Sequence, residues 1–506
     1  MKRVLLIVVD GCTSRILGPA IDRGELPLLG ALARSGWLDL RCVSIFPSIT
    51  PAATASIVTG RYPARHGIAG MSWWNPSSGQ VAYYGDDVWT VLKRGPGEFL
   101  RDFLLRLNGE RLRSPTMFEV VERQGLRAAC FNHLIFRGDV EHELTQPILL
   151  QLLPSVGSSL IVRGPSWLSL GDFVSSRPHR HDLQTSGGVF NRFGLDDEGT
   201  AGFLSELPDA TALPDFTVAY FADYDFESHQ RGPGAAIDTL RTLDGRLASL
   251  FDGWGGVDRV LRDVCIVLTA DHSHSGVDES DRAGILLQDL LSGFRCGDPA
   301  AGWRDGDELL LCPNMRAAEV YVRDGRDIVD RVAHDLLEDE RVDHVIWCDR
   351  RDGGACRVAT GDRGALHFTR ARGRTDAPRD DYGTPWDLNG EPAALDIRVQ
   401  NGRIRYGAYP NALERVANSI EDPRSGRMWV TARPGHEFGV TGQSVHPGAG
   451  SHGTLHELDS LVPLLVAGHP AGAERRTAPA RIVDAAPIAA AALGIHFDVA
   501  AGQSHA

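Results

Sequence analysis

The chain has 506 residues and a formal net charge of −14, with 42% hydrophobic and 23% charged residues. These fractions are those of an ordinary soluble globular protein, and the length exceeds the roughly 250–300 residues at which single cores stop growing. The negative charge disfavours a nucleic acid as an obligate partner, because such binding rests on clustered Lys and Arg. It does not exclude a small phosphorylated substrate, since bound metal ions reverse the local field. We therefore expect one large domain with a substantial insertion.

The first predicted element is a core strand over Val4–Val9. This apolar run ends at Asp10 without a small-residue cleavage site, so a strand fits better than a secretory signal peptide. No stretch approaches the roughly 18–20 apolar residues that a membrane span needs. The 8 cysteines include no CxxC pair, which is typical of reduced thiols in a cytosolic protein. We therefore predict a cytoplasmic protein that does not contact a membrane.

Short β-branched runs alternate with helical segments along the chain. A helix is expected from Ser114-Pro115 to Gly125, because a cap-type residue there precedes a proline. From Ile237 to Leu250, apolar residues recur at three- and four-residue spacing, which predicts an amphipathic helix. Further strands are expected at Arg127–Phe131, Phe216–Phe221, Cys265–Thr269 and Leu461–Val466. The alternation predicts an α/β fold with a mostly parallel central sheet flanked by helices.

Residues 280–435 have a different pattern, in which Gly, Asp and Arg clusters separate short strands. Such strands are expected at Glu319–Val322, His344–Cys348 and Leu395–Val399. We predict that residues 280–435 form an inserted α+β cap subdomain. Residues 1–279 and 436–506 would then form the catalytic domain. The irregular stretch Ser176–Gly202 is a candidate flap over the site.

Oxygen and imidazole side chains stand where several of these apolar runs end. Open parallel sheets keep their sites at the carboxyl ends of their strands, so we expect these side chains to meet there. Carboxylates and imidazoles are ligands that zinc accepts, and two divalent ions can clamp both oxygens of a phosphoryl displacement. The candidate residues are Asp10, Thr50, Asp225, His229, Asp271, His272 and His452.

Each of these residues has an ordinary alternative role. Asp10 can begin a turn, and Thr50 can be a helix N-cap. His272 and His452 can be polar residues hydrogen-bonded at strand ends. Asp223 rivals Asp225, although the four-residue spacing to His229 favours Asp225. Four other histidines are interpreted as solvated or structural: His66, His274, His446 and His456.

The order of the motifs strengthens the metal-site hypothesis. The chain shows Asp10-Gly11 after the first strand, and Thr50 stands six residues before a Ser-Ile-Val-Thr-Gly run that begins at Ser56. Later motifs are Tyr62-Pro63, His66-Gly67-Ile68, Asp225 with His229 and Gly232-Pro233, Ala270-Asp271-His272-Ser273-His274, and His452-Gly453. In this order they resemble the alkaline phosphatase superfamily, and within it the type I nucleotide pyrophosphatase/phosphodiesterase family. The resemblance covers roughly residues 1–275 and 440–495.

The resemblance implies two zinc ions and a covalent mechanism. It implies one ion on Asp225, His229 and His452, and a second on Asp10, Asp271, His272 and the Thr50 oxygen. Thr50 would be the nucleophile and would carry a phosphoryl group during hydrolysis of phosphodiester or pyrophosphate bonds. A helix over Ala52–Val58 would direct backbone N–H groups towards the phosphate, although Pro51 cannot donate one.

One position departs from the family pattern and leaves the substrate class open. The family carries an Asn five residues after the His of its His-Gly-Ile motif, and this chain has Met71 there. Candidate substrate-binding residues that replace it are Trp74, Asn75, Asn132 and Arg137. Trp74 offers an apolar face for stacking, and Arg137 suits a bidentate hold on an anion. Ordinary surface or sheet-edge roles are the alternative for both.

Three functions therefore stay under consideration. The first is a phosphodiesterase or pyrophosphatase acting through Thr50. The second is a phosphomonoesterase or phosphonate hydrolase on the same two-metal core. A non-catalytic, metal-stabilised binding protein is the third, which the retention of every ligand position disfavours. Sulfatases need a modified Cys or Ser in a Cys/Ser-x-Pro-x-Arg sequence, whereas the chain reads Thr50-Pro51-Ala52.

Overall fold

The computed structural model describes residues 2–85, 96–144, 161–176, 194–323, 326–349, 355–420, 426, 428–440, 445–469 and 478–498. Its larger sheet has eight strands in the order β2-β25-β11-β1-β10-β5-β8-β9. The strand bounds are β1 Arg3–Val9, β2 Gly36–Val43, β5 Ala128–Phe131, β8 Trp167–Leu170, β9 Val174–Ser176, β10 Phe216–Phe221, β11 Val264–Thr269 and β25 Leu461–Ala467.

The centre of this sheet is parallel. Strand β1 pairs in parallel with β10 and β11, and β5 pairs in parallel with β10 and β8. The pairings of β25 with β2 and β11, and of β9 with β8, are antiparallel. Every residue of Val4–Val9 is buried, as expected for a strand covered on both faces. The predicted α/β fold with a mostly parallel sheet is confirmed.

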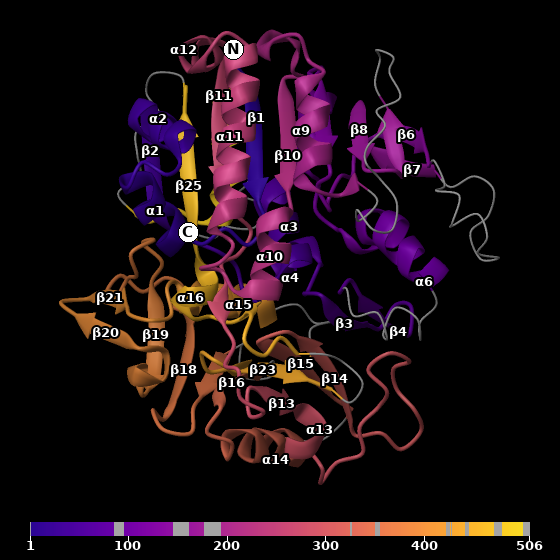
Figure 1. Ribbon diagram of the computed structural model, residues 1–506. Coiled ribbons are helices and arrows are strands. Elements are labelled where there is room, and N and C mark those ends of the chain that lie inside the picture. Colours follow the sequence, from indigo (N-terminus) through magenta and orange to yellow (C-terminus); the bar gives the residue numbers. More distant parts are fainter. Residues whose placement is uncertain are drawn as a thin grey trace.

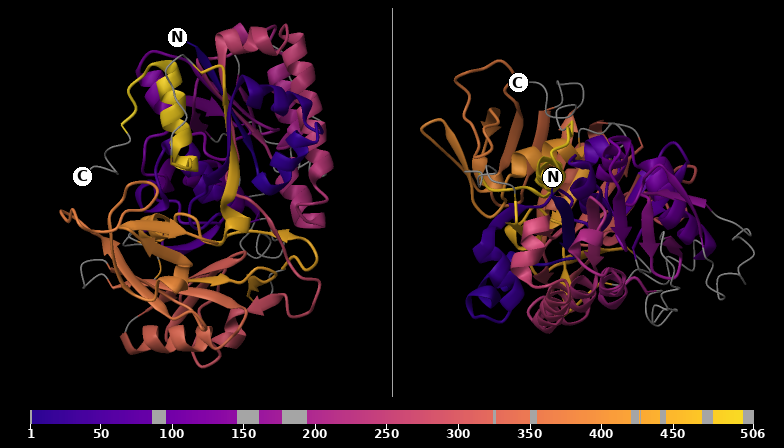
Figure 2. Two further views of the ribbon diagram at one scale, coloured as in Figure 1. Left: turned by 90° about the vertical axis from the view of Figure 1, so that its left-hand side faces the viewer. Right: turned by 90° about the horizontal axis from the view of Figure 1, so that it is seen from above.

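Helices cover both faces of the larger sheet (Figure 2). Helix α17 packs on β1 and β11 from one side, whereas α2 contacts β25 on the other side and packs against α11. The larger helices are α1 Ser14–Asp22, α2 Pro27–Ser35, α3 Thr50–Thr59, α7 Met117–Arg123, α9 Asp197–Ser205, α10 Asp223–Arg231, α11 Ile237–Gly253, α12 Val257–Asp263 and α17 Ala485–Leu493. Shorter ones are α4 Pro63–His66, α6 Pro96–Arg101, α16 Glu457–Ser460, the π-helix η1 Asp102–Arg111, and the 3₁₀ helices η3 Ala210–Ala212 and η5 Ile482–Asp484.

A second, antiparallel sheet of seven strands lies beyond the end of the larger sheet at which β1 ends (Figure 1). Its order is β14-β15-β22-β16-β17-β18-β19. The bounds are β14 Leu309–Asn314, β15 Ala317–Val322, β16 Val342–Asp349, β17 Ala355–Ala359, β18 Ala365–Arg370, β19 Trp386–Gly390 and β22 Met428–Ala432. Its helices are α13 Leu287–Leu290, α14 Arg326–Leu337, α15 Ala412–Ile420 and the 3₁₀ helix η4 Pro392–Leu395. All strands of this sheet lie within the range expected for the inserted subdomain.

Five two-stranded sheets complete the described part of the chain. They pair β3 Ser72–Asn75 with β4 Gln80–Tyr83, β6 Val140–Glu143 with β7 Ile161–Gly164, β12 Ser275–Gly276 with β24 Gly450–Ser451, β13 Gly284–Leu286 with β23 Glu437–Gly439, and β20 Ile397–Gln400 with β21 Arg403–Tyr406. The β12–β24 pair joins the segment after Asp271 to the segment before His452. It therefore brings two predicted ligand motifs together.

Some predicted boundaries differ from the structure. Helix α7 begins at Met117 because Thr116 forms a capping box with Glu119. The strand expected at Leu395 begins at Ile397, since η4 ends at Leu395 and Asp396 adopts a positive φ of 46°. Within the stretch Ser176–Gly202, α9 begins at Asp197, and residues 177–193 lie outside the described residues.

Candidate metal centre and active site

All seven predicted ligand-type residues lie at one edge of the larger sheet. Asp10 follows β1, Asp271 follows β11 after Ala270, and Asp225 lies in the first turn of α10, just after β10. These three strands are parallel neighbours, so their carboxyl ends coincide. Thr50 is the first residue of α3, and His452 directly follows β24.

The first group of ligand atoms comes from Asp225, His229 and His452. The Nε2 atoms of the two imidazoles are 3.3 Å apart, and they lie 3.6 Å (His229) and 3.9 Å (His452) from Asp225 Oδ1. His229 Nδ1 is 2.9 Å from the Gly450 carbonyl and His452 Nδ1 is 2.8 Å from that of Ser48, so we assign the N–H to Nδ1 in both. Two bare Nε2 acceptors then face each other, which is favourable only with a cation between them.

The second group surrounds His272 Nε2. Thr50 Oγ1 lies 2.9 Å from this atom, Asp10 Oδ1 3.4 Å and Asp271 Oδ2 3.6 Å. The oxygens Asp10 Oδ1 and Asp271 Oδ2 are buried and have no hydrogen-bond partner among the described residues. Ligands about 2.0–2.2 Å from a tetrahedral zinc stand about 3.3–3.6 Å from one another. Both groups therefore fit a divalent ion such as zinc.

The charges of the site also fit bound cations. Burial and the neighbouring carboxylates of Asp225 and Asp271 raise the pKa of Asp10 well above its usual range. Burial lowers the pKa of His229 to about 4 and that of His452 well below its usual range, so both imidazoles are neutral at pH 7. Neutral imidazoles are the form that binds metal, and a dication relieves the repulsion between crowded carboxylates.

Gly11 lets the first strand turn at the site. Its φ is +66°, and its N–H donates to Asp271 Oδ1 at 3.1 Å. A Cβ at this position would lie 2.7 Å from His274 Cδ2 and 2.9 Å from Asp225 Oδ1. The glycine of the Asp10-Gly11 motif therefore permits both the left-handed turn and the close approach of these side chains.

Sequence reasoning left His274 out, but the structure places it in the site. It is fully buried, and its Nε2 lies 2.5 Å from Asp225 Oδ1. Its Nδ1 has no hydrogen-bond partner among the described residues. This pattern is the reverse of that of His229 and His452, so we assign His274 as a donor that orients Asp225. Its place two residues after His272 is the sequence signal that could have identified it.

Asp225 rather than Asp223 contacts the histidines. Asp223 instead accepts from the Asp197 N–H, at 3.3 Å, and its own N–H donates to Asp197 Oδ1, at 3.0 Å. It therefore joins α10 to α9. The four-residue spacing to His229 selects the correct carboxylate because residues four apart share one face of a helix.

A buried ion pair holds two ligand-bearing loops. Arg316 and Asp459 are both fully buried, and Arg316 Nη1 donates to Asp459 Oδ1 at 2.5 Å. Asp459 Oδ2 accepts from the Thr454 N–H at 3.0 Å and its hydroxyl at 2.6 Å. The Asp459 carbonyl accepts from the Ser273 N–H at 2.9 Å. One carboxylate residue thus fixes the segments that follow His272 and His452.

A cavity of about 230 Å³ opens at Thr50, between the two sheets. Asp225, His229 and His452 also line it. Its apolar wall includes Met71, Phe103, Leu134, Phe136, Leu170 and Met315. Substrate can reach Thr50 from this cavity.

Only one of the four predicted substrate-binding residues lines this cavity. It is Asn132, whose amide is held by protein groups. Arg137 instead pairs with Glu119 at 3.0 Å, and its other guanidinium nitrogens donate to Glu119 and to main-chain carbonyls. Trp74 and Asn75 line a separate depression beside β3. Trp74, Asn75 and Arg137 therefore lie outside the lining of this cavity, because β3 and the Glu119 carboxylate direct them elsewhere.

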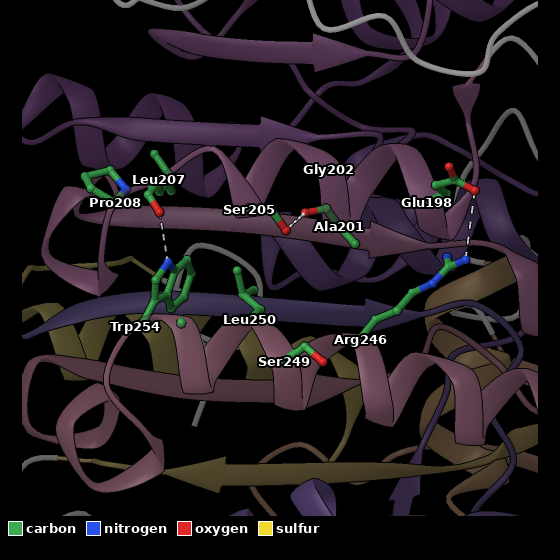
Figure 3. Close-up of a pocket in the computed structure, with 11 residues that line it drawn as sticks. Glu198, Ala201, Gly202, Ser205, Leu207, Pro208, Arg246, Ser249, Leu250 and Trp254 are labelled. Atoms are coloured by element: carbon green, nitrogen blue, oxygen red, sulfur yellow. Dashed lines mark hydrogen bonds and ion pairs between the residues drawn. The ribbon is translucent and has the colours of Figure 1, made fainter.

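A larger depression of about 830 Å³ lies away from this site, between α9 and α11 (Figure 3). Trp254 Nε1 donates to the Leu207 carbonyl at 3.1 Å, and Arg246 lies 4.0 Å from Glu198. None of the candidate metal ligands lines it. The larger volume of this depression therefore does not make it the candidate active site, because the ligand-type side chains lie at the smaller cavity.

Comparisons with known proteins identify the family of this chain and proteins with a similar fold. Solved structures with a similar fold include phosphonoacetate hydrolase from Sinorhizobium meliloti 1021 in complex with phosphonoformate (TM-score 0.57, 19% identity, 97% of this chain and 96% of that chain). Another is murine ectonucleotide pyrophosphatase/phosphodiesterase 5 (TM-score 0.57, 12% identity, 98% and 96%). A comparison with curated proteins finds no match. Residues 4–455 match the family model described as type I phosphodiesterase / nucleotide pyrophosphatase. The chain therefore belongs to the type I phosphodiesterase/nucleotide pyrophosphatase family.

Proposed function

We propose that this chain hydrolyses phosphodiester or pyrophosphate bonds with two zinc ions and with Thr50 as the nucleophile. The observation that carries the proposal is the position of Thr50. Its Oγ1 lies 2.9 Å from His272 Nε2, within a cluster of ligand atoms, and Thr50 lines the cavity. A hydroxyl in this position is next to ligand-type side chains, and a metal ion bound by them would make it reactive at neutral pH.

Asp225, His229 and His452 would hold one ion, and Asp10, Asp271, His272 and the Thr50 oxygen the other. Bound divalent ions would stabilise the deprotonated hydroxyl and the negative charge of the phosphoryl oxygens. Thr50 Oγ would form a bond to phosphorus while the bond to the leaving oxygen breaks. Water would then displace Thr50 from phosphorus and restore the hydroxyl. His274 would keep Asp225 oriented through its Nε2–H.

The N-terminus of α3 would contribute to phosphate binding. The first N–H groups of a helix have no partner within the helix, and the helix dipole favours negative charge there. Pro51 lacks an N–H, so the N–H groups of Thr50 and Ala52 would be the donors.

Phosphonate or phosphomonoester hydrolysis is the second candidate. It is favoured by Met71, which lines the cavity at the position where the family resemblance leads us to expect an Asn. The similarity in fold to a phosphonoacetate hydrolase is compatible with this candidate. Both candidates use the same metal ligands and differ in the group that occupies the cavity.

A paired assay distinguishes the two candidates. The zinc-loaded protein is given bis-p-nitrophenyl phosphate and p-nitrophenyl phosphate, beside the Thr50→Ala and Thr50→Ser variants. Faster diester cleavage that Thr50→Ala abolishes and Thr50→Ser partly retains supports the phosphodiesterase. Faster monoester cleavage supports the second candidate, and full activity of Thr50→Ala excludes the covalent route.

We also propose a cytoplasmic location and the division into a catalytic domain (1–279 and 436–506) and an inserted cap subdomain (280–435). The 8 cysteines include no CxxC pair, as expected for a reducing compartment. No helix in the described part of the chain is both long and apolar enough to cross a membrane. Limited proteolysis that cuts inside either unit before it cuts near residues 280 and 435, or secretion of the native protein, would contradict these assignments.

A further inference from the structure

The shape of the cavity at Thr50 limits the size of its ligand. The apolar wall defined above is contributed by segments far apart in sequence: Phe103 comes from η1, Leu170 ends β8, and Met315 connects β14 to β15. Phe136 and Leu170 are almost fully buried, at 1% and 3% exposure. Pockets for drug-sized ligands measure about 300–1,000 Å³, whereas this one measures about 230 Å³. It therefore suits a compact group.

Asn132, which lines the cavity, offers little to a ligand. Its Nδ2 donates to the Gly194 carbonyl at 3.0 Å and to Thr200 Oγ1 at 2.9 Å, so both amide hydrogens are used. Its Oδ1 accepts from the Gly171 N–H at 2.8 Å. The amide therefore fixes the cavity wall instead of binding substrate.

Apart from the candidate metal ligands, the other polar side chains of the wall are neutral. Two tyrosine hydroxyls are engaged, whereas His133 Nε2 has no hydrogen-bond partner among the described residues. The Tyr220 hydroxyl donates to Asp10, and the Tyr84 hydroxyl donates to the Asp102 carbonyl. Burial lowers the pKa of His133 to about 4, so its imidazole is neutral at pH 7. Among the described residues, no Lys or Arg lines the cavity.

We propose that the cavity takes a compact, uncharged, apolar group of the phosphoester, about as large as a phenyl ring. This inference rests on the proposed function and names its substrate class. A nucleobase would leave several of its nitrogen and oxygen atoms without hydrogen bonds against this wall, which costs affinity. A carboxylate against the apolar wall, away from the metal ligands, would be buried with no Lys or Arg of the described residues beside it, which costs still more.

Binding is measured directly by calorimetry on the zinc-loaded protein, so the test does not require turnover. The probes are phenylphosphonate, methylphosphonate and phosphonoacetate, which share a phosphonate and differ only in the attached group. One well-placed methylene in an apolar pocket changes affinity by about tenfold or more. Phenylphosphonate is therefore expected to bind at least about tenfold more tightly than methylphosphonate. Phosphonoacetate is expected to gain nothing over methylphosphonate.

Two variants that add the same positive charge test whether the binding preference arises in the cavity. Met71→Lys places a cation on the cavity wall at a partly exposed position. Val399→Lys adds the same charge on β20, where the side chain is exposed and does not line the cavity. Met71→Lys should weaken phenylphosphonate and strengthen phosphonoacetate, each by about tenfold or more. Val399→Lys should leave all three affinities unchanged.

Equal affinities for phenylphosphonate and methylphosphonate would overturn the inference. So would tighter binding of phosphonoacetate by the unaltered chain, or no binding of any probe. Failure of the proposed function is separate, because phenylphosphonate binding without cleavage of either p-nitrophenyl ester would refute the function and keep the inference. Thr50-dependent diester cleavage with equal affinities for phenylphosphonate and methylphosphonate would support the function and refute the inference.

Discussion

The ion pair between Arg316 and Asp459 gives a quantitative prediction about how the metal centre is held. Asp459 Oδ1 accepts from Arg316 at 2.5 Å and from the Ser275 hydroxyl at 2.7 Å, and Oδ2 accepts twice from Thr454. In Asp459→Asn, one oxygen becomes an NH₂ group that faces donors, and Arg316 stays buried without a counter-charge. Breaking a buried pair from one side costs about 3–5 kcal/mol. We therefore expect the free energy of unfolding of the metal-free protein to fall by about this amount.

A control variant with the same chemical change at an exposed ion pair separates the effect of burial from the effect of removing a charge. Asp139→Asn removes a carboxylate that pairs with Arg123, and both side chains of that pair are about half exposed. An exposed pair contributes roughly 0–1 kcal/mol, so this variant should be nearly as stable as the unaltered chain. Urea denaturation of the metal-free proteins compares the two changes. Zinc affinity, measured against a competing chelator, should fall only in Asp459→Asn, because that residue holds the loops of His272 and His452.

The contribution of Asp459 to the free energy of unfolding depends on pH in a direction that follows from its pKa. Burial raises the pKa of Asp459, but the guanidinium of Arg316 and hydrogen bonds from Thr454 and Ser275 more than offset this and hold it below its usual range. The contribution is therefore complete above the ordinary pKa of about 3.9 and is lost as the pH falls through the lower, folded pKa. The stability difference between the unaltered chain and Asp459→Asn should shrink below about pH 4. Equal stability and equal zinc affinity of the two at pH 7 would refute this account.

Three further predictions concern the metal centre. Thr50→Ala should abolish turnover while elemental analysis still finds zinc, because Thr50 supplies one ligand of several; loss of all zinc would contradict this. Asp271→Ala should lose zinc as well as activity, and full occupancy would exclude Asp271 as a ligand. His274→Phe keeps a ring in place but removes the N–H that orients Asp225, so zinc affinity should fall by about 10–100-fold. Chelator competition measures this, and an unchanged affinity would show that His274 has no such role.

The sequence predicted the elements that repeat a simple physical pattern. Each strand expected in the larger sheet is present within a residue or two, because fully buried parallel strands are continuous apolar runs. Asp10 and Asp271 could be located because they follow two such runs. The same reasoning chose Asp225 over Asp223 from its helical spacing to His229.

Features that depend on tertiary contacts could not be predicted. The Arg316–Asp459 pair joins residues 143 positions apart and has no local pattern. Arg137 looked available for an anion, but Glu119 and the carbonyls of Leu112 and Ser114 bind its guanidinium. His274 was set aside because a lone histidine is usually structural, and only the fold brings Asp225 to its Nε2.

Trapping the covalent adduct tests the central claim most directly. The zinc-loaded protein is mixed with bis-p-nitrophenyl phosphate, quenched in acid within the first turnovers, and digested for mass spectrometry. The account predicts a p-nitrophenyl phosphoryl group on the peptide that contains Thr50, and its absence from the Thr50→Ala protein. Turnover of the diester with no adduct at Thr50, or with an adduct on another residue, would contradict it.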